Sequence, residues 1–266
     1  MKITIIGTGN IGGAIAMGLA NSSMIATSDI TCVDILPKNL ENIIAKNPEI
    51  NTTSNAIEGI QDADIILLAL KPWIIGGSIN QIKEHINPFK QMVVSVAAGI
   101  SFEEIREYFK INDSNEKTPP LFRLIPNTAI EVKSSLTLIA SYNASKEQES
   151  LLLDIFNELG EAILVPEKLL SAGTSVASCG IAFALRYIRA STVGSVELGF
   201  SPEQAQSIVM QTLKGAVEIL KSHGTNPEQE IDKVTTPGGV TIKGLNKMEE
   251  NGFTNAVIKG LLAASK

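Results

Sequence analysis

The sequence has few of the residues that mark disulfide frameworks, metal centres and histidine-based catalysis. Its 266 residues include two cysteines and two histidines. Cys32 and Cys179 are far apart in the chain, which argues against a disulfide framework and favours a reducing compartment. His85 and His223 fall on a predicted helix surface and at a predicted helix end, so we interpret them as surface or capping residues. Because no His, Cys or Asp cluster has metal-ligand spacing, we predict no metal site.

Long basic runs and long apolar runs are also missing. The net charge is −6, which argues against binding to nucleic acid or to an anionic membrane. The longest apolar run, Ile65–Leu70, is too short to span a bilayer. Residues 1–6 lead directly into a predicted core strand, so we expect no signal peptide and predict a cytoplasmic protein.

The apolar residues that are present alternate between strand-like and helix-like patterns in the first part of the chain. Strands rich in β-branched residues alternate with helical periodicity, which predicts right-handed crossovers and a mostly parallel sheet. We predict strands at 3–6, 30–34, 65–70, 92–97, 121–125, 136–140 and 162–165, and helices at about 13–18, 38–46, 74–86 and 101–110, with a further helix opened by a capping box at Ser145–Gln148.

No strand-like pattern follows Val165. The sequence therefore predicts an α/β domain over 1–165 and an all-helical domain over 166–266. We predict helices at 167–177 and 180–199, one from a capping box at Ser201 to about Lys221, one starting at Asn226-Pro227, one after a Pro-Gly-Gly turn, and a last one capped by Thr254. Helix 180–199 is apolar on nearly all sides, which favours burial at a subunit interface over a central place in a monomeric bundle.

A glycine-rich loop, Gly7-Thr8-Gly9-Asn10-Ile11-Gly12, lies between the first strand and the first helix. That context favours a dinucleotide site, because Gly7 allows a tight turn, Gly9 lets the backbone approach a pyrophosphate and Gly12 permits close helix packing. The pyrophosphate is expected at the helix N-terminus, beside Thr8, Asn10 and Ile11.

Asp34 follows the second strand, 22 residues after Gly12, where a carboxylate binds the adenosine ribose of NAD. It would repel a 2′-phosphate, and Ile35 beside it carries no charge, although Lys38 could partly compensate. We therefore predict NAD(H) or NADP(H) as the cofactor and favour NAD(H). Further cofactor contacts are predicted at or near strand ends, where such sheets bind ligands: Asn55 (equally a loop cap), Ala69, Leu70, Lys71, Pro72, Val96, Ala97 and Ala98.

The segment Val234–Leu245 has three threonine hydroxyls around Pro237-Gly238-Gly239, directly before a helical pattern. Glycines let the backbone approach a ligand, and free N–H groups at a helix start attract anions. The physical pattern fits a carboxylate cradle with a polar handle and fits an ordinary capping turn equally well. Because alcohol oxidation needs a strong base that this chain lacks, a C=N substrate, whose nitrogen is already basic, suits it better.

These motifs together resemble the pyrroline-5-carboxylate reductase family over essentially the whole chain. The parallel stretches are the glycine-rich loop, Ala69–Pro72, Ser95–Gly99, Ile125–Thr128, Leu198–Ala205 and, most specific, Asp232–Ile242. The resemblance implies NAD(P)H-dependent reduction of 1-pyrroline-5-carboxylate, a small imino acid, to L-proline. It also implies a helical C-terminal domain that forms homodimers or rings of dimers.

Residue roles follow from the resemblance by position. It implies that Thr241 contacts the imine nitrogen as the catalytic hydroxyl, and that the backbone of Gly239, Val240 and Thr241 holds the substrate carboxylate, helped by Thr236. Lys233 and Glu167 match positions that line the substrate pocket.

The chain departs from the family pattern at Ser178–Ala182, where the family usually has Gly-Ser-Gly-Pro-Ala. The family often has Arg where Ile35 stands. Two alternatives therefore stay open: a related imine or β-hydroxyacid reductase with another small carboxylate, and a non-catalytic dinucleotide-binding regulatory protein.

Overall fold

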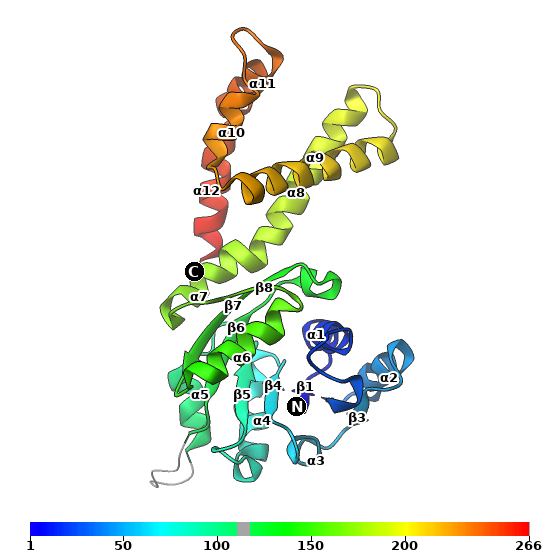
Figure 1. The fold of residues 1–266 in the computed structure, drawn as a ribbon, viewed down its shortest axis with the longest axis vertical. Coiled ribbons are helices and arrows are strands. Elements are labelled where there is room, and N and C mark those ends of the chain that lie inside the picture. The colour runs from blue at the N-terminus through cyan, green and yellow to red at the C-terminus, as the bar shows by residue number, and fades with distance from the viewer. Residues whose placement is uncertain (111–117, 266) are drawn as a thin grey trace. The chain divides into compact units, whose positions relative to one another are not determined.

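The computed structural model describes residues 1–110 and 118–265, and the chain divides into two compact units, Met1–Ser178 and Cys179–Lys266 (Figure 1). The predicted domain boundary at residue 165 precedes this division. Leu170 and Ala177 are buried in the core of the first unit, so the segment that follows the last strand packs with the sheet.

Within the described part of the first unit, eight strands form one sheet in the order β3-β2-β1-β4-β5-β6-β7-β8. β6 and β7 are antiparallel, and each other neighbouring pair is parallel. The mostly parallel, Rossmann-like sheet is thus confirmed. The strands are Ile3–Ile6 (β1), Ile30–Val33 (β2), Asn51–Thr53 (β3), Ile65–Leu68 (β4), Met92–Ser95 (β5), Leu121–Ile125 (β6), Ser135–Tyr142 (β7) and Gly160–Leu164 (β8).

Helices cover both faces of this sheet, because successive side chains of each buried strand point to opposite faces. Ile5 and Leu67 pack on the face covered by α1, α2 and α6, whereas Ile6 and Leu68 pack on the face covered by α3, α4 and α5. The helices are Asn10–Ala20 (α1), Pro37–Lys46 (α2), Ala56–Ile60 (α3), Pro72–Ile82 (α4), Phe102–Phe109 (α5), Lys146–Asn157 (α6) and Leu170–Gly173 (α7).

Three local features differ from the predictions. The short strand β3 and helix α3 carry no apolar run long enough to reveal them in the sequence. The helix expected over 74–86 ends at Ile82 and gives way to a 3-10 turn at Lys83–His85. The helix expected over 167–177 is a 3-10 turn at Glu167–Leu169, then α7, then a π-helical segment at Thr174–Cys179.

Among its described residues, the second unit consists of helices and the short segments that connect them. Its helices are Gly180–Glu197 (α8), Pro202–His223 (α9), Pro227–Lys233 (α10), Val240–Glu250 (α11) and Phe253–Ala264 (α12). α8 packs against α9, α11 packs against α12, and the rings of Tyr187 and Phe253 meet edge to face at 6.3 Å. A capping box starts α9 at Ser201, as predicted, and α10 starts at Asn226-Pro227, as predicted, with a capping box that was not foreseen.

The predicted cap of the last helix is wrong. Gly252, in a left-handed conformation (φ 77°), precedes α12, and Thr254 lies inside the helix. The Thr254 hydroxyl donates to Glu249 Oε1 at 2.6 Å instead of capping its own helix. A glycine in the left-handed conformation lets the chain turn into a helix without a side-chain cap. A Ser or Thr pattern in the sequence does not reveal such a helix start.

Helix α8 exposes much of its apolar surface in the single chain. Leu185 is 58% and Val193 is 53% exposed. By length and composition alone, the helical run Glu167–Glu197 could also cross a membrane, a test that core helices of soluble proteins pass too. The predicted subunit interface would remove this apolar surface from water.

Candidate functional site

The glycine-rich loop between β1 and α1 has steric needs that differ at each glycine. Gly7 has φ +93°, and a Cβ there would lie 2.6 Å from the Ala69 carbonyl oxygen. A Cβ at Gly12 would lie 1.9 Å from the Gly7 carbonyl oxygen. A Cβ at Gly9 would meet no atom of the described residues within 4 Å, so within that part of the chain the space in front of Gly9 is open to a ligand.

Helix α1 begins with its first N–H groups available. Gly9 occupies the N-cap position in extended backbone, no side chain caps the helix, and its first turn carries no acidic residue. Such a helix start attracts an anion through its N–H groups and its dipole. A pyrophosphate therefore fits beside Asn10 and Ile11.

The carboxylate of Asp34 joins the end of β2 to the loop. Its Oδ2 accepts hydrogen bonds from the Thr8 N–H at 2.8 Å, the Thr8 hydroxyl at 3.1 Å and the Asn39 amide at 2.8 Å. Its Oδ1 accepts from the Leu36 N–H at 2.9 Å. Burial alone would raise the pKa of Asp34, but these hydrogen bonds outweigh it and lower that pKa below its ordinary value. Asp34 is thus a fixed negative charge at neutral pH.

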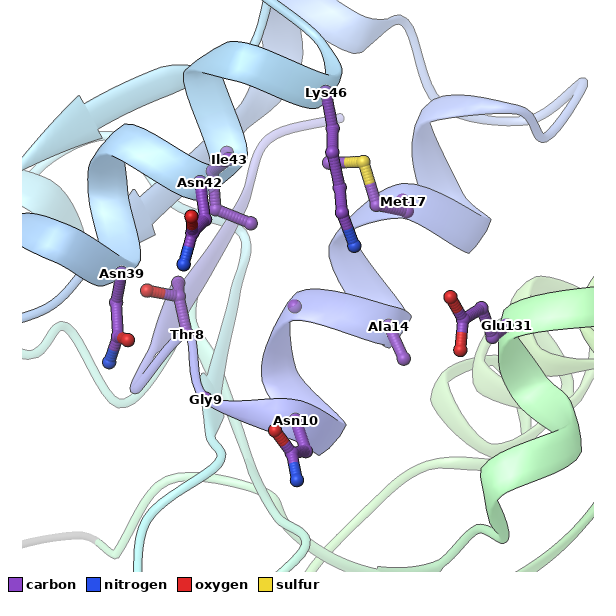
Figure 2. A pocket seen from close by; sticks show the side chains of 11 residues that line it. Thr8, Gly9, Asn10, Ala14, Met17, Asn39, Asn42, Ile43, Lys46 and Glu131 are labelled. Carbon is purple, nitrogen blue, oxygen red and sulfur yellow. The ribbon is translucent and has the colours of Figure 1, made fainter.

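A pocket of about 250 Å³ adjoins the loop between α1 and α2. Figure 2 shows that α2 contributes Lys46 and that the segment Thr128–Val132 contributes Glu131. Its lining residues are Thr8, Gly9, Asn10, Gly13, Ala14, Met17, Asn39, Asn42, Ile43, Lys46 and Glu131. Three predicted cofactor residues, Thr8, Gly9 and Asn10, line this pocket.

The remaining predicted cofactor residues lie at the carboxyl ends of neighbouring strands. β1, β4 and β5 are parallel and in register, with Ile6 opposite Leu68 and Leu68 opposite Ser95. The segments Ala69–Pro72 and Val96–Ala98 therefore follow β4 and β5 at the same edge as Gly7. The strand order reverses between β1 and β4, which is where sheets of this type bind ligands.

Asn55 caps helix α3. Its Oδ1 accepts from the N–H groups of Ile57 at 3.1 Å and Glu58 at 3.4 Å. Lys71 precedes Pro72, the first residue of α4, and is exposed. These positions combine a local structural role with a place at the ligand-binding edge.

Glu167, predicted to line the substrate pocket, lies in the first unit and is paired. Its Oε1 accepts from Arg123 Nη1 at 2.6 Å and from the Phe102 N–H at 2.7 Å. Phe102 is the first residue of α5, so this carboxylate binds one of the free N–H groups at a helix start. The pair links β6, α5 and the segment after β8, and the sequence contains no local pattern that predicts it.

The π-helical segment is tied to the end of β6. The Asn127 amide donates to the Ala177 carbonyl at 3.0 Å, and the buried Ser175 hydroxyl has no partner among the described residues. The departure from the family motif at Ser178–Ala182 begins at the end of this segment.

The Pro-Gly-Gly turn of the second unit opens α11 as the glycine-rich loop opens α1. Gly238 has φ +70°, and Gly239 occupies the N-cap position in extended backbone. No side chain caps α11, and its first turn carries no acidic residue. The Thr236 hydroxyl lies 2.5 Å from the position that a Cβ on Gly239 would take, so only glycine fits there without a shift. The N–H groups of Val240 and Thr241 are thus arranged to accept an anion, whereas the Gly239 N–H, which was predicted to join them, donates to the Thr236 carbonyl at 3.0 Å.

The other predicted substrate residues of this unit differ in their contacts. Thr241 is half-buried, and its hydroxyl has no hydrogen-bond partner within residues 1–110 and 118–265. Lys233 instead donates to Glu230 Oε1 at 2.7 Å. Hydrogen bonds from Lys233 first, then from the Thr225 hydroxyl, lower the pKa of Glu230 to about 2. Lys233 therefore presents a charge that Glu230 partly neutralises.

Two family models match the chain. The model described as "Pyrroline-5-carboxylate reductase dimerisation" matches residues 167–266, and the model described as "NADP oxidoreductase coenzyme F420-dependent" matches residues 2–99. The second unit and the segment before it thus correspond to a dimerisation domain. The first unit corresponds to an NAD(P)-binding oxidoreductase domain.

Relatives of known name agree with these matches over the whole chain. Pyrroline-5-carboxylate reductase 2 of Dictyostelium discoideum is 33% identical over 100% of this chain and 91% of its own length. Pyrroline-5-carboxylate reductase of Methanosarcina acetivorans is 30% identical over 100% of this chain and 96% of its own length. Pyrroline-5-carboxylate reductase 1 of Dictyostelium discoideum is 34% identical, and the matched part is only 48% of that longer protein.

Solved structures have the same fold. The pyrroline carboxylate reductase of Plasmodium falciparum, solved with NADP bound, superposes with a TM-score of 0.87 at 27% identity, over 100% of this chain and 95% of that one. The pyrroline-5-carboxylate reductase of Coxiella burnetii gives a TM-score of 0.88 at 26% identity, over 99% and 96%. Family models, full-length relatives and folds agree, and the chain belongs to the pyrroline-5-carboxylate reductase family.

Proposed function

We propose that this protein reduces 1-pyrroline-5-carboxylate to L-proline, the last step of proline biosynthesis, with a reduced nicotinamide cofactor. The observation that carries the proposal is the start of α11. It combines uncapped N–H groups with the unpartnered hydroxyl of Thr241, in a chain that belongs to this family. When bound, the cofactor supplies the hydride for the imine carbon, and the imine nitrogen takes up one proton.

The chain's own residues position and polarise the substrate. The N–H groups of Val240 and Thr241 would hold the carboxylate, because uncapped donors and the helix dipole both favour an anion at this point. Gly239 would shape the turn, since its own N–H donates to the Thr236 carbonyl at 3.0 Å. The Thr236 hydroxyl lies against Gly239 and supports this turn. The Thr241 hydroxyl would donate to the ring nitrogen directly or through a water, which assists protonation of a base that needs only a weak acid.

Charged residues near the substrate are proposed to act through their pairs. Lys233 would add a screened positive charge near the carboxylate, since Glu230 holds its amino group. Glu167 would reach the pocket only with its free oxygen, because Oε1 binds Arg123 and the Phe102 N–H. Most of the rate enhancement would come from holding two reactants in one orientation.

The cofactor site favours a dinucleotide and, in our proposal, NAD(H). The fixed negative charge of Asp34 would repel a 2′-phosphate, and Ile35, which is 84% exposed, offers no cation beside it. Lys38 is exposed on α2 and would reduce this repulsion. The Plasmodium falciparum relative was solved with NADP bound, so a direct comparison of both cofactors is needed.

The test is cofactor oxidation by the purified protein. Consumption of NADH and of NADPH is followed with 1-pyrroline-5-carboxylate, and L-proline is identified as the product. Turnover with either cofactor supports the proposal. Binding of a dinucleotide without turnover of this imine would reject it.

A related imine or β-hydroxyacid reductase is a second candidate, supported by one observation. Ile181 follows a π-helical segment at the place where the family motif usually has proline. A panel of small cyclic imines and β-hydroxyacids separates the two, because a higher kcat/KM for another member of the panel would favour the second candidate.

We also propose that the protein works as a homodimer, or as a ring of such dimers. The dimerisation model matches residues 167–266, and α8 leaves Leu185 and Val193 more than half exposed. Light scattering of the full chain that gives the mass of a stable monomer would reject this assembly.

A further inference from the structure

Two side chains converge on Asp34 from different elements. The Thr8 hydroxyl comes from the glycine-rich loop and the Asn39 amide comes from the first turn of α2, and both bind the same oxygen, Oδ2. Thr8 is 5% exposed, so its hydroxyl is almost wholly enclosed. Hereafter these two groups and the Asp34 carboxylate are called the Asp34 clasp.

The two oxygens of Asp34 have unequal capacity left. Oδ2 accepts three hydrogen bonds, counting the Thr8 N–H, which uses all of its acceptor sites. Oδ1 accepts one, from the Leu36 N–H, and keeps a free acceptor site. Any ribose hydroxyl that binds this carboxylate must therefore donate to Oδ1. Donors from Thr8, Leu36 and Asn39 hold the carboxylate against rotation.

We infer that Thr8 and Asn39 determine the selectivity between NADH and NADPH by holding Asp34 in one orientation. The inference rests on the proposed role of Asp34 at the adenosine ribose. A fixed carboxylate offers Oδ1 to the 2′-hydroxyl of NADH, and it cannot turn away from the 2′-phosphate of NADPH. A released carboxylate would bind the hydroxyl less well and would repel the phosphate less.

This role differs from simple support of the loop. Loosening the loop would weaken both cofactors equally, since both share the pyrophosphate that the loop binds. Releasing Asp34 weakens NADH and spares or improves NADPH. A change in the ratio of the two dissociation constants therefore indicates that Asp34 has lost its fixed orientation. An equal change in both constants indicates only that the loop has loosened.

Thr8→Val and Asn39→Leu each remove one donor while they keep the approximate size of the side chain. Thr8→Ser keeps the hydroxyl and should rescue the loss. Asn47→Leu is the matched control, because Asn47 lies at the C-terminal end of α2, does not line this pocket and makes no hydrogen bond with Asp34. Thermal unfolding checks that each variant is folded.

The measurement is the dissociation constant of NADH and of NADPH for the full chain, from nicotinamide fluorescence without any imine. A hydrogen bond to a charged group predicts about a tenfold loss of NADH affinity in Thr8→Val and in Asn39→Leu. The NADPH affinity should fall by less, so that the ratio shifts toward NADPH, while Thr8→Ser and Asn47→Leu leave the ratio unchanged.

Equal losses for both cofactors, or no change in either, would overturn the inference, as would a native protein that binds neither dinucleotide. The result is separate from the proposed imine reduction. If the variants show the shifted ratio but the native protein does not turn over 1-pyrroline-5-carboxylate, the inference about the Asp34 clasp stands and the proposed substrate is wrong.

Discussion

Two glycines of the dinucleotide loop, Gly9 and Gly12, should respond differently to one added methyl group. Gly12→Ala places a Cβ 1.9 Å from the Gly7 carbonyl oxygen and 2.9 Å from the Ala69 Cβ. The first of these neighbours is backbone, so the start of α1 must move. Overpacking of this kind costs about 1–3 kcal/mol, whereas the gain in helix propensity from glycine to alanine is at most about 1 kcal/mol. The clash should dominate, and Gly12→Ala should be less stable.

Gly9→Ala should separate binding from stability. A Cβ there meets no atom within 4 Å, and the backbone φ of −67° suits alanine. Reduced freedom of the unfolded chain should leave stability unchanged or raise it by about 0.4–1 kcal/mol. The same methyl group would occupy the space proposed for the pyrophosphate, so the affinity for both dinucleotides should fall by about tenfold or more.

Thermal unfolding and fluorescence titration with NADH and NADPH measure the two effects. For a chain of about this size, each kcal/mol shifts Tm by about 2–4 °C. Gly12→Ala should lower Tm, and Gly9→Ala should not. A Gly9→Ala protein that binds both cofactors normally would refute the place given to the pyrophosphate. A Gly12→Ala protein as stable as the native chain would refute the close contact of Gly12 with Gly7 and Ala69.

Three other changes test the remaining parts of the account. Thr241→Val should lower kcat/KM for 1-pyrroline-5-carboxylate by about tenfold to a hundredfold, while dinucleotide affinity stays unchanged. Thr241→Ser keeps the hydroxyl and is the active control. Equal kinetics in both variants would refute the role of the Thr241 hydroxyl. Arg123→Met should destabilise the sheet unit by about 1–3 kcal/mol in urea unfolding, because it removes the ion pair with Glu167. The loss should be smaller than for a fully buried pair, since Glu167 is 37% exposed. An unchanged unfolding midpoint would show that this ion pair does not stabilise the unit. Glu230→Gln should lower Tm above about pH 4.5, because a carboxyl group with a lowered pKa contributes stability in its ionised form. The Tm values of the variant and the native protein should converge as the pH falls toward about 2, where the carboxyl group becomes protonated. A Tm difference that stays undiminished at that pH would show that the charge of Glu230 is not its cause.

The glycine-rich loop and the positions of the main strands along the chain could be predicted because their signals are local. The apolar runs of β1, β4 and β5 are continuous, since both of their faces are buried. β3 escaped prediction because Asn51–Thr53 is a short, polar edge strand. Its place depends on pairing with β2, which no local pattern reveals.

The partners of the candidate site residues could not be predicted for the same reason. Asn39 reaches Asp34 only because β2 and α2 meet at a tight turn, and Arg123 reaches Glu167 across 44 residues of chain. The π-helical turns at Thr174–Cys179 also depend on tertiary contacts, among them the Asn127 amide on the Ala177 carbonyl. Thr241 and Gly239 could be predicted as candidate residues because they belong to a sequence motif. That α11 has no side-chain cap is visible only in the structure.

The central claim is that the α11 start and the dinucleotide loop serve one reaction, the reduction of a cyclic imino acid. The most direct measurement is the steady-state rate of NADH and NADPH oxidation by the full chain with 1-pyrroline-5-carboxylate, compared between the native protein, Thr241→Val and Thr241→Ser. The account predicts L-proline formation by the native protein, a strong loss of kcat/KM in Thr241→Val and near-native turnover in Thr241→Ser. A native protein that binds the dinucleotide but forms no L-proline with either cofactor would contradict it.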